Sequence, residues 1–363
     1  MLRFGDLLVS NYSNDPNFNI EEIYPASVFR NICSIEKLRK WAAYVDKYLL
    51  FPKRLKRNLI TRKDPLHLIH IIDHSNSIYL PKLNHLTEGK KIITCHDLIA
   101  IRTANGDFAQ APKTSKSGKR LQNWILNSLR HANYYACDSK QTQQDLNRLI
   151  PKSKKRSSII HLGTEADLST TDSDKKALSR LLPFDHHTTN FLLHVGSAAW
   201  YKNRKDVFRS FIHAHTSLPD RHLNLVLVGP EPQKEEIDKP LSNWIKSHPN
   251  AIFSLQNLHD NDLAELYKHA KALVSPSFIE GFGWPPLEAA VRGCPVITTR
   301  TGAISDLLGS YASYVETDNQ KSIDQGVLQV LQSARSNKRA ITLPSNEDCR
   351  EQYYDLYQKM MEN

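Results

Sequence analysis

The sequence predicts an α/β protein built from two tandem, doubly wound, Rossmann-like domains. In both halves of the chain, short apolar runs alternate with segments whose apolar residues recur at helical spacing. Strands that alternate with helices form parallel sheets covered on both faces, and the buried strands of such sheets are nearly continuous apolar runs. The 363 residues are enough for two domains of ordinary size.

The first half contains four expected strands and two expected helices. The strands are 67–73, 90–98, 132–139 and 158–163, and the helices are 121–132 and 141–150. The polar stretch 164–176 separates the two halves and is typical of a linker. We therefore expect a first domain over residues 1–170 and a linker over residues 171–188.

The second half repeats this alternation and closes with a helix. Its strands are expected at 191–197, 223–231, 272–277 and 295–299, and its helices at 261–270, 285–293 and 348–363. The helix at 285–293 has Pro at its start and Gly at its end, which is the asymmetry that helix ends favour. We expect the second domain to span residues 189–345 and a terminal helix to span residues 346–363.

The composition favours a protein of the cytoplasm. Hydrophobic residues make up 40% of the chain, and no apolar run approaches the roughly 20 residues that span a bilayer. The start, MLRFGDLLVS, lacks the basic, apolar and small-residue parts of a secretory signal. The five cysteines are scattered without a C-x-x-C pair, which favours free thiols in a reducing compartment.

The positive charge is concentrated in the first half. Residues 1–180 carry 30 Lys and Arg against 17 Asp and Glu, a net +13, and residues 181–363 carry a net −3. This asymmetry favours an anionic partner, such as a membrane surface, a phosphate-linked acceptor or nucleic acid, but solubility alone also explains it. The segment Trp41–Arg57 mixes aromatic residues with cations, as helices at a membrane interface do. A core-facing helix followed by a solvated basic run explains the same pattern.

The segment EGFGWPPLEAA, residues 280–290, points to a ligand site. It joins an expected strand to an expected helix and so lies at the carboxyl edge of the second sheet, where doubly wound folds bind ligands. Gly281 and Gly283 let the backbone approach a ligand closely, and the free amides at the helix start favour an anion such as a diphosphate. Glu280 and Glu288 flank this point, and a carboxylate accepts hydrogen bonds from two sugar hydroxyls at once.

Other interpretations of this segment remain on the residue pattern alone. The dinucleotide fingerprint has a third glycine, which this segment lacks. A metal site would place His or Asp beside the glutamates, and none is adjacent. A capped surface loop with solvated glutamates stays open.

Residues 261–317 resemble the C-terminal signature of the group 1 glycosyltransferases, which are retaining GT-B enzymes of the family 4 type that use nucleotide-sugars. The E-x7-E hallmark of the family is matched by Glu280 and Glu288 within SPSFIEGFGWPPLEAAVRGCPVITT. The resemblance implies that Glu280 reaches the transferred sugar and that Glu288 binds the ribose hydroxyls. It also implies no metal and no cofactor besides the nucleotide-sugar donor.

Further segments extend the resemblance. In the family, the backbone between the two glutamates meets the sugar and the phosphates. This role falls here on Gly281, Phe282 and Gly283. The segment HVGSAAWYKNRKDV, 194–207, resembles the family segment whose lysine holds the diphosphate, and Lys202 and the strand-end Gly196 match it. A lysine suits this role because charge builds on the leaving phosphate as the sugar bond breaks.

The roles of two further positions, Ser197 and His96, are less clearly defined by the resemblance. Many family members have an Arg directly after the strand glycine, where this chain has Ser197. Arg204 or Lys205 is a candidate to replace that Arg, and solvated surface charges explain both residues as well. In the first half, TCHDL resembles the family's H-D-L, which implies that His96 faces the cleft and touches the donor sugar or its phosphate. A lone His is more often structural, but the end of a strand favours a functional role.

The N-terminus departs from the family, and residues 40–52 resemble a bacterial branch of it. The first domain of the family opens with a strand, a glycine-containing loop and a helix, whereas this chain opens with helix-spaced apolar residues around Gly5. Residues 17–24 resemble the second strand. We therefore expect the first strand and its loop to be absent from the N-terminal sheet.

The sequence thus predicts an enzyme that moves a sugar, with retention of configuration, from a nucleotide-diphosphate sugar to a glycan or lipid-linked acceptor, near an anionic membrane. Glu280, His96 and Lys202 are the expected catalytic residues. A non-catalytic binding subunit and a nucleotide-sugar epimerase on the same fold are the alternatives. No RNA- or DNA-binding motif supports a nucleic-acid partner.

Overall fold

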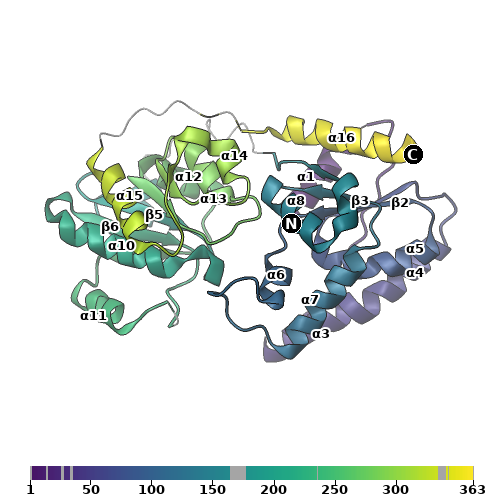
Figure 1. The fold of residues 1–363 in the computed structure, drawn as a ribbon, viewed down its shortest axis with the longest axis horizontal. Coiled ribbons are helices and arrows are strands. Elements are labelled where there is room, and N and C mark those ends of the chain that lie inside the picture. The colour runs from purple at the N-terminus through teal and green to yellow at the C-terminus, as the bar shows by residue number, and fades with distance from the viewer. Residues whose placement is uncertain are drawn as a thin grey trace.

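The computed structural model shows two lobes, each a parallel sheet flanked by helices, with the last helix lying along the N-terminal lobe (Figure 1). It describes residues 2–13, 15–25, 28–32, 36–163, 177–234, 236–333, 341 and 343–362. The linker expected at 164–176 lies outside the described residues. The first described element after it is α9 (Ala177–Leu181).

The first sheet consists of four parallel strands in the order of the sequence. They are β1 (Leu68–Ile71), β2 (Lys90–Cys95), β3 (Tyr134–Cys137) and β4 (Ser157–Ile159). The helices between them are α5 (Leu80–Leu86), α6 (Ile99–Asn105), α7 (Lys116–Leu129) and α8 (Lys140–Leu149). The four strands and two helices predicted for this half are confirmed. Because the strands are parallel, the residues that follow them share one edge of the sheet.

Helices precede this sheet. They are α1 (Leu2–Tyr12), α2 (Val28–Ile32), α3 (Glu36–Val45) and α4 (Phe51–Ile60), with the π-helical turn η1 (Asp46–Leu50) before α4. The prediction that residues 17–24 form a strand is wrong. No described strand pairs with this segment, and most of its side chains are exposed. Phe18 instead joins a ring cluster with Tyr12 and Tyr357.

The second sheet has six parallel strands whose order reverses in the middle. They are β5 (Asn190–Val195), β6 (Leu223–Val228), β7 (Ile252–Leu255), β8 (Ala272–Ser275), β9 (Val296–Thr298) and β10 (Ser313–Tyr314). The spatial order is β10-β9-β8-β5-β6-β7, so the chain winds outward in both directions from β5 and β8. The predicted doubly wound arrangement is thereby confirmed for the second domain, whereas the described strands of the first sheet follow one another in a single direction. The switch point between β5 and β8 is where folds of this type bind ligands.

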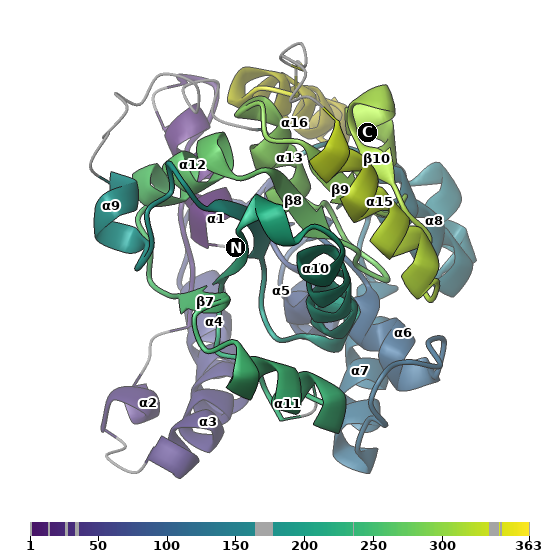
Figure 2. The same cartoon turned by 90° about the vertical axis from the view of Figure 1, so that its left-hand side faces the viewer.

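Helices cover both faces of the second sheet. They are α10 (Arg204–Ser217), α11 (Lys239–Ser247), α12 (Asp260–His269), α13 (Trp284–Val291), α14 (Ile304–Leu308) and α15 (Gln320–Gln332). On one face, α10 and α15 lie side by side, whereas α12 and α13 cover the other (Figure 2). Successive residues of β5 serve these two cores: Leu192 packs with the α10 and α15 face and Leu193 with the α12 and α13 face. This alternation follows from the two-residue period of a strand.

The terminal helix α16 (Asn346–Glu362) packs against α1 and β1 of the first domain (Figure 1). The hydroxyl of Tyr353 lies 2.9 Å from Oγ1 of Thr94, and that of Tyr357 lies 2.7 Å from Nδ1 of His70. The helix itself was predicted from its spacing of apolar residues. Its position against the first domain was not predicted, because its apolar stripe could pack against either sheet.

Two further properties concern the described residues as a whole. None of their helices is both long and apolar enough to cross a membrane. Four of the cysteines, Cys95, Cys137, Cys294 and Cys349, are buried free thiols. The predicted state of these four cysteines is therefore confirmed.

Candidate active site at the switch point

The two loops that follow β5 and β8 meet at the switch point of the second sheet. The loop after β5 leads into the short 3-10 turn η5 (Trp200–Lys202), and the loop after β8 carries Glu280. The main-chain N–H of Phe278 donates to the carbonyl of Tyr201 at 2.8 Å, which holds the two loops together. The structure thereby brings together Lys202 and Glu280, which lie 78 positions apart in the chain.

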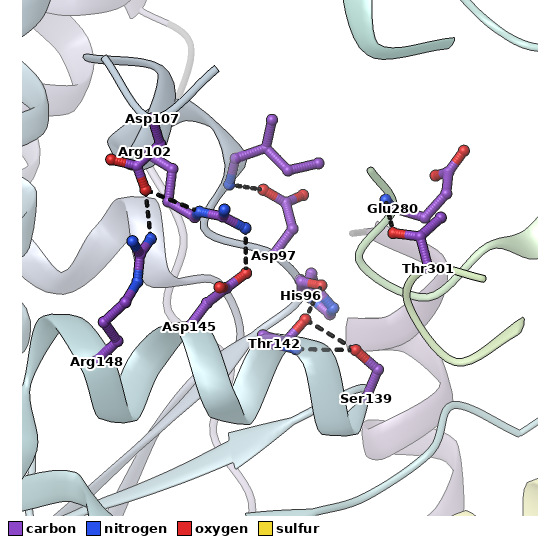
Figure 3. Close-up of polar contacts among 11 residues, drawn as sticks. His96, Asp97, Arg102, Asp107, Ser139, Thr142, Asp145, Arg148, Glu280 and Thr301 are labelled. Atoms are coloured by element: carbon purple, nitrogen blue, oxygen red, sulfur yellow. Dashed lines mark hydrogen bonds and ion pairs between the residues drawn. The ribbon is translucent and has the colours of Figure 1, made fainter. Parts of the chain in front are cut away.

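Lys202 and Glu280 form a buried ion pair. The Nζ atom of Lys202 lies 2.7 Å from Oε1 and 3.0 Å from Oε2 of Glu280, and the two side chains are 12% and 7% exposed. Ser277 Oγ donates to Oε1 at 2.7 Å, and the main-chain N–H of Glu280 donates to Thr301 Oγ1 at 3.0 Å (Figure 3). Buried charges are tolerated when such hydrogen bonds satisfy them. The pair therefore presents an ammonium group and a carboxylate at one fixed place.

Gly281 and Gly283 bring the loop after β8 close to its surroundings. A Cβ atom on Gly281 would lie 2.1 Å from the carbonyl oxygen of His96, so only glycine lets the second domain approach the end of β2 this closely. Gly283 has a φ of 97°, and a Cβ atom there would lie 2.5 Å from the side chain of Ile304. Gly281 thus shapes the contact between the domains beside Glu280, and Gly283 lets the same loop pack closely against α14 within the second domain.

His96 lies at the end of β2 with both ring nitrogens engaged. Nδ1 lies 2.6 Å from Oδ2 of Asp138, and Nε2 lies 2.9 Å from the carbonyl oxygen of Ile72, which can only accept. Burial opposes a charge on this ring, but the Asp138 carboxylate raises the pKa of His96 to about 9. The ring is therefore an imidazolium at neutral pH and donates through both nitrogens. Its predicted contact with the donor sugar or phosphate stays a prediction.

Glu288, Phe282 and Gly196 are the remaining predicted site residues. Glu288 is half-buried on α13, and the hydroxyl of Tyr267 on α12 donates to its Oε2 at 3.1 Å. Phe282 is buried, and its ring lies 6.2 Å from that of His161 in the first domain. Gly196 follows β5 and donates its N–H to a carbonyl of β6 at 3.0 Å. The roles expected of these residues toward the donor stay predictions.

The two cations that follow Lys202 both contact the loop after β6. Arg204 is buried, and its Nε lies 3.3 Å from Oε1 of Glu236. Lys205 Nζ lies 3.4 Å from Oδ2 of Asp238 at the surface. Ser197 is exposed, and the expectation that one of these cations replaces the Arg missing at that position stays a prediction.

Three residues that the sequence did not single out hold the site together. Asp138 orders the His96 ring, and Ser277 and Thr301 bind Glu280. Asp138 follows β3 directly, and β3 pairs with the strand that precedes His96, so the shared carboxyl edge was a signal for it. Ser277 had no comparable signal, because serine is common in any loop.

One group of residues in the described part of the chain has metal-ligand geometry. The ligand atoms of Asp185, His186 and His187 all lie within 4.8 Å of one another. These residues precede β5 and lie toward its amino end, whereas Lys202 and Glu280 follow the carboxyl ends of their strands. The group is therefore separate from the candidate site.

Comparison with known proteins identifies a relationship for the second domain. The model of the family described as glycosyl transferases group 1 matches residues 183–343. The serotype-specific mannosyltransferase WbdA of Escherichia coli is 26% identical over 215 residues, which are 56% of this chain and 26% of that protein. This chain thus spans about a quarter of the length of that relative. The O-antigen chain mannosyltransferase B of Escherichia coli is 26% identical over 305 residues, 81% of this chain and 73% of that one.

A solved structure supports the architecture. The sucrose-phosphate synthase of Thermosynechococcus elongatus superposes with a TM-score of 0.67 over 99% of this chain and 89% of that one. Only 17% of the aligned residues are identical, so this likeness concerns the fold alone. It supports the tandem arrangement of two Rossmann-like domains that is named GT-B.

Proposed function

Because the chain carries a group 1 glycosyl transferase domain over residues 183–343 in a GT-B fold, we propose that it transfers a sugar from a nucleotide-diphosphate sugar to a glycan or lipid-linked acceptor. The observation that carries this proposal is the buried Lys202–Glu280 pair at the switch point between β5 and β8. A sugar diphosphate offers a partner to each member of this pair.

The donor would bind with its diphosphate beside Lys202 and the start of α13. The ammonium group of Lys202 neutralises negative charge, and the positive end of the α13 dipole lies at the same edge. Pro285 and Pro286 have no N–H, so among the first three residues of α13 only Trp284 offers a main-chain amide. Glu280, held by Ser277 and Thr301, would accept hydrogen bonds from sugar hydroxyls. Bringing an anion to Lys202 loosens its hold on Glu280, so the carboxylate becomes free to bind the sugar as the phosphate arrives.

The transfer would proceed with retention of configuration. The bond between the anomeric carbon and the leaving phosphate oxygen breaks, and a bond to the acceptor oxygen forms on the same face. The acceptor proton passes to the departing phosphate oxygen, so no further base is required. The contribution of the protein is then orientation and charge stabilisation by Lys202, Glu280 and Glu288, with His96 closing the site from the first domain.

The first experiment identifies the donor. A panel of nucleotide sugars is scored by the rise in melting temperature, because a ligand that binds only the folded state stabilises it. The two relatives described above are named mannosyltransferases, so nucleotide-linked mannose is the first sugar to include. A donor that binds is then offered glycan and lipid-linked acceptors, and the product is analysed for anomeric configuration.

The second experiment tests the residues. Lys202→Ala and Glu280→Ala are each expected to lower kcat by about a hundredfold or more, because both act where charge develops. Lys246→Ala is the matched control, since it removes an exposed lysine from α11 of the same domain. Transfer at the wild-type rate by either site variant would refute the assignment. Donor binding without transfer to any acceptor would favour the binding-subunit alternative, and a free epimerised product would favour the epimerase.

We also propose that the first domain contacts an anionic membrane through α4. This helix buries Phe51, Pro52 and Leu55. Its exposed side chains include Lys53, Arg54, Lys56, Arg57 and Ile60. Leu49 before it is also exposed, at 59%. Trp124 on α7 is 46% exposed, and its ring lies 5.6 Å from that of Tyr48 in η1. Cations beside exposed apolar side chains are typical of surfaces that lie on anionic lipid.

The membrane contact is tested by co-sedimentation with vesicles. Binding should require anionic lipid and should weaken as salt rises, because the attraction is screened. The double variant Lys56→Glu/Arg57→Glu should lose binding, whereas Lys246→Glu on the second domain should keep it. Binding that ignores both salt and lipid charge would contradict the proposal.

A further inference from the structure

His194 on β5 has a buried ring nitrogen that is left without a partner. The side chain is 1% exposed, and its Nδ1 lies 2.8 Å from the main-chain carbonyl oxygen of Val274 on the neighbouring β8. Its other nitrogen, Nε2, is buried and has no hydrogen-bond partner within the part of the chain that the structure describes. Buried polar atoms are almost always paired, so this nitrogen calls for an explanation.

The hydrogen bond to Val274 fixes the protonation of the ring. A carbonyl oxygen only accepts, so Nδ1 carries the proton and Nε2 presents a lone pair. Burial lowers the pKa of His194 to about 4. The charges of Arg204 and Lys202 also lower the pKa, whereas the hydrogen bond to Val274 raises it. At neutral pH, Nε2 is therefore an acceptor that lacks a donor.

The free nitrogen lies beside Gly196 and Lys202, two residues of the predicted donor site. His194 and Gly196 are two residues apart, so they lie on the same side of the extended chain. A Cβ atom on Gly196 would lie 3.4 Å from Nε2 of His194 and 3.5 Å from Cδ of Lys202. The free nitrogen, Gly196 and the stem of Lys202 therefore adjoin one another. Nε2 is closed to solvent while Lys202 is paired with Glu280, and movement of the Lys202 side chain toward a bound phosphate would uncover it.

We propose that His194 is a donor-binding residue whose Nε2 accepts a hydrogen bond from a hydroxyl group of the nucleotide sugar at Gly196. The inference rests on the proposed function and adds a contact that selects for a hydrogen-bond donor. An ionised phosphate oxygen does not satisfy this nitrogen, because it has no hydrogen to give. The hydroxyl belongs either to the ribose or to the transferred sugar, and the two sources are separated by experiment.

The test uses a variant that changes only the free nitrogen. In His194→Asn, the amide reaches the place of Nδ1 and still donates to the Val274 carbonyl, but nothing takes the place of Nε2. The dissociation constant of the nucleotide sugar should rise about tenfold or more, because a buried hydrogen bond to the ligand is lost. If the nucleoside diphosphate alone is weakened equally, the hydroxyl belongs to the ribose; if it binds as to the wild type, the hydroxyl belongs to the sugar.

A second measurement does not depend on a variant. Nitrogen NMR of the wild-type protein labelled at histidine should show His194 protonated at Nδ1 only, with an Nε2 signal that moves on saturation with the nucleotide sugar. An Nε2 signal that stays in place, or unchanged nucleotide-sugar affinity in His194→Asn, overturns the inference while leaving the proposed function intact. Failure of wild-type protein to bind any nucleotide sugar overturns the proposed function instead.

Discussion

At the scale of single residues, the Lys202–Glu280 pair is expected to govern stability as well as binding. Removing one member of a buried ion pair leaves the other charge without compensation, and Lys202→Met should therefore lower the free energy of unfolding by about 3 kcal/mol. The double variant Lys202→Met/Glu280→Gln should recover most of this loss, because no buried charge remains. Urea unfolding of the two single variants and the double variant measures the interaction between Lys202 and Glu280. If the loss in the double variant equalled the sum of the two single losses, the pair would not interact and the prediction would be wrong.

The His96–Asp138 pair predicts how stability depends on pH. The pKa of His96 rises from 6.5 to about 9 in the folded protein, so the folded state holds its proton more tightly than the unfolded state. The stabilisation is therefore complete below about pH 6.5 and is lost as the pH rises through about 9. Urea unfolding across this range should show the decline, and Asp138→Asn should flatten it. If the free energy of unfolding of Asp138→Asn fell by the same amount over this pH range, the decline would come from other groups.

Particular residues show how far sequence alone reaches. Lys202 and Glu280 were both predicted to bind the donor, because each follows an apolar strand of the second sheet, but their direct contact was not predicted. The free nitrogen of His194 was not predicted, since a histidine inside an apolar strand gives no sign of which nitrogen is satisfied. That information lies in the register between β5 and β8, which brings Val274 beside it.

At the scale of elements, the loop before α13 is set by its glycines. Gly281→Ala would push a methyl group against the carbonyl of His96, and the domains would then separate at this point. We expect donor affinity to fall about tenfold or more while the second domain stays folded, as the far- and near-UV circular dichroism will show. Gly106→Ala is the control, because the space around its Cβ position is open, although its φ of 84° strains an alanine. Equal effects of both variants would show that the loss does not come from the contact with His96.

The elements also show why some boundaries were predictable and others were not. The Pro and Gly residues around α13 mark its ends in the sequence, and the structure places it at Trp284–Val291. Residues 17–24 resemble the second strand of the family but pair with no described strand, so the resemblance misled there. The position of α16 depends on buried hydrogen bonds of Tyr353 and Tyr357 to β1 and β2, which no local pattern encodes.

At the scale of the whole molecule, an arm of the first domain reaches the second domain beside the site. The arm consists of residues 106–115, between α6 and α7 (Figure 1). Its Phe108 ring lies 5.1 Å from that of Trp200, which in turn lies 6.1 Å from Phe278. Trp200 belongs to the turn that carries Lys202, and Phe278 to the loop that carries Glu280. The arm therefore connects the arrangement of the domains to the geometry of the ion pair.

The contact between Phe108 and Trp200 leads to a prediction about the arrangement of the two domains. In Phe108→Ala, the loss of the ring contact should favour a more open arrangement and a larger radius of gyration in X-ray scattering. The donor should restore the compact form, because it bridges the site. Trp124→Ala is the control, since it removes an exposed ring that does not lie between the domains. An unchanged radius in Phe108→Ala would show that other contacts hold the domains.

The central claim is that a nucleotide sugar binds at the switch point between β5 and β8. The most direct measurement is a crystal structure of the protein with a nucleoside diphosphate. We predict a phosphate oxygen within about 3 Å of Lys202 Nζ, the length of a charged hydrogen bond, with Glu280 facing the space left for the sugar. A nucleotide bound elsewhere, with Lys202 and Glu280 still paired to each other and out of its reach, would contradict the claim.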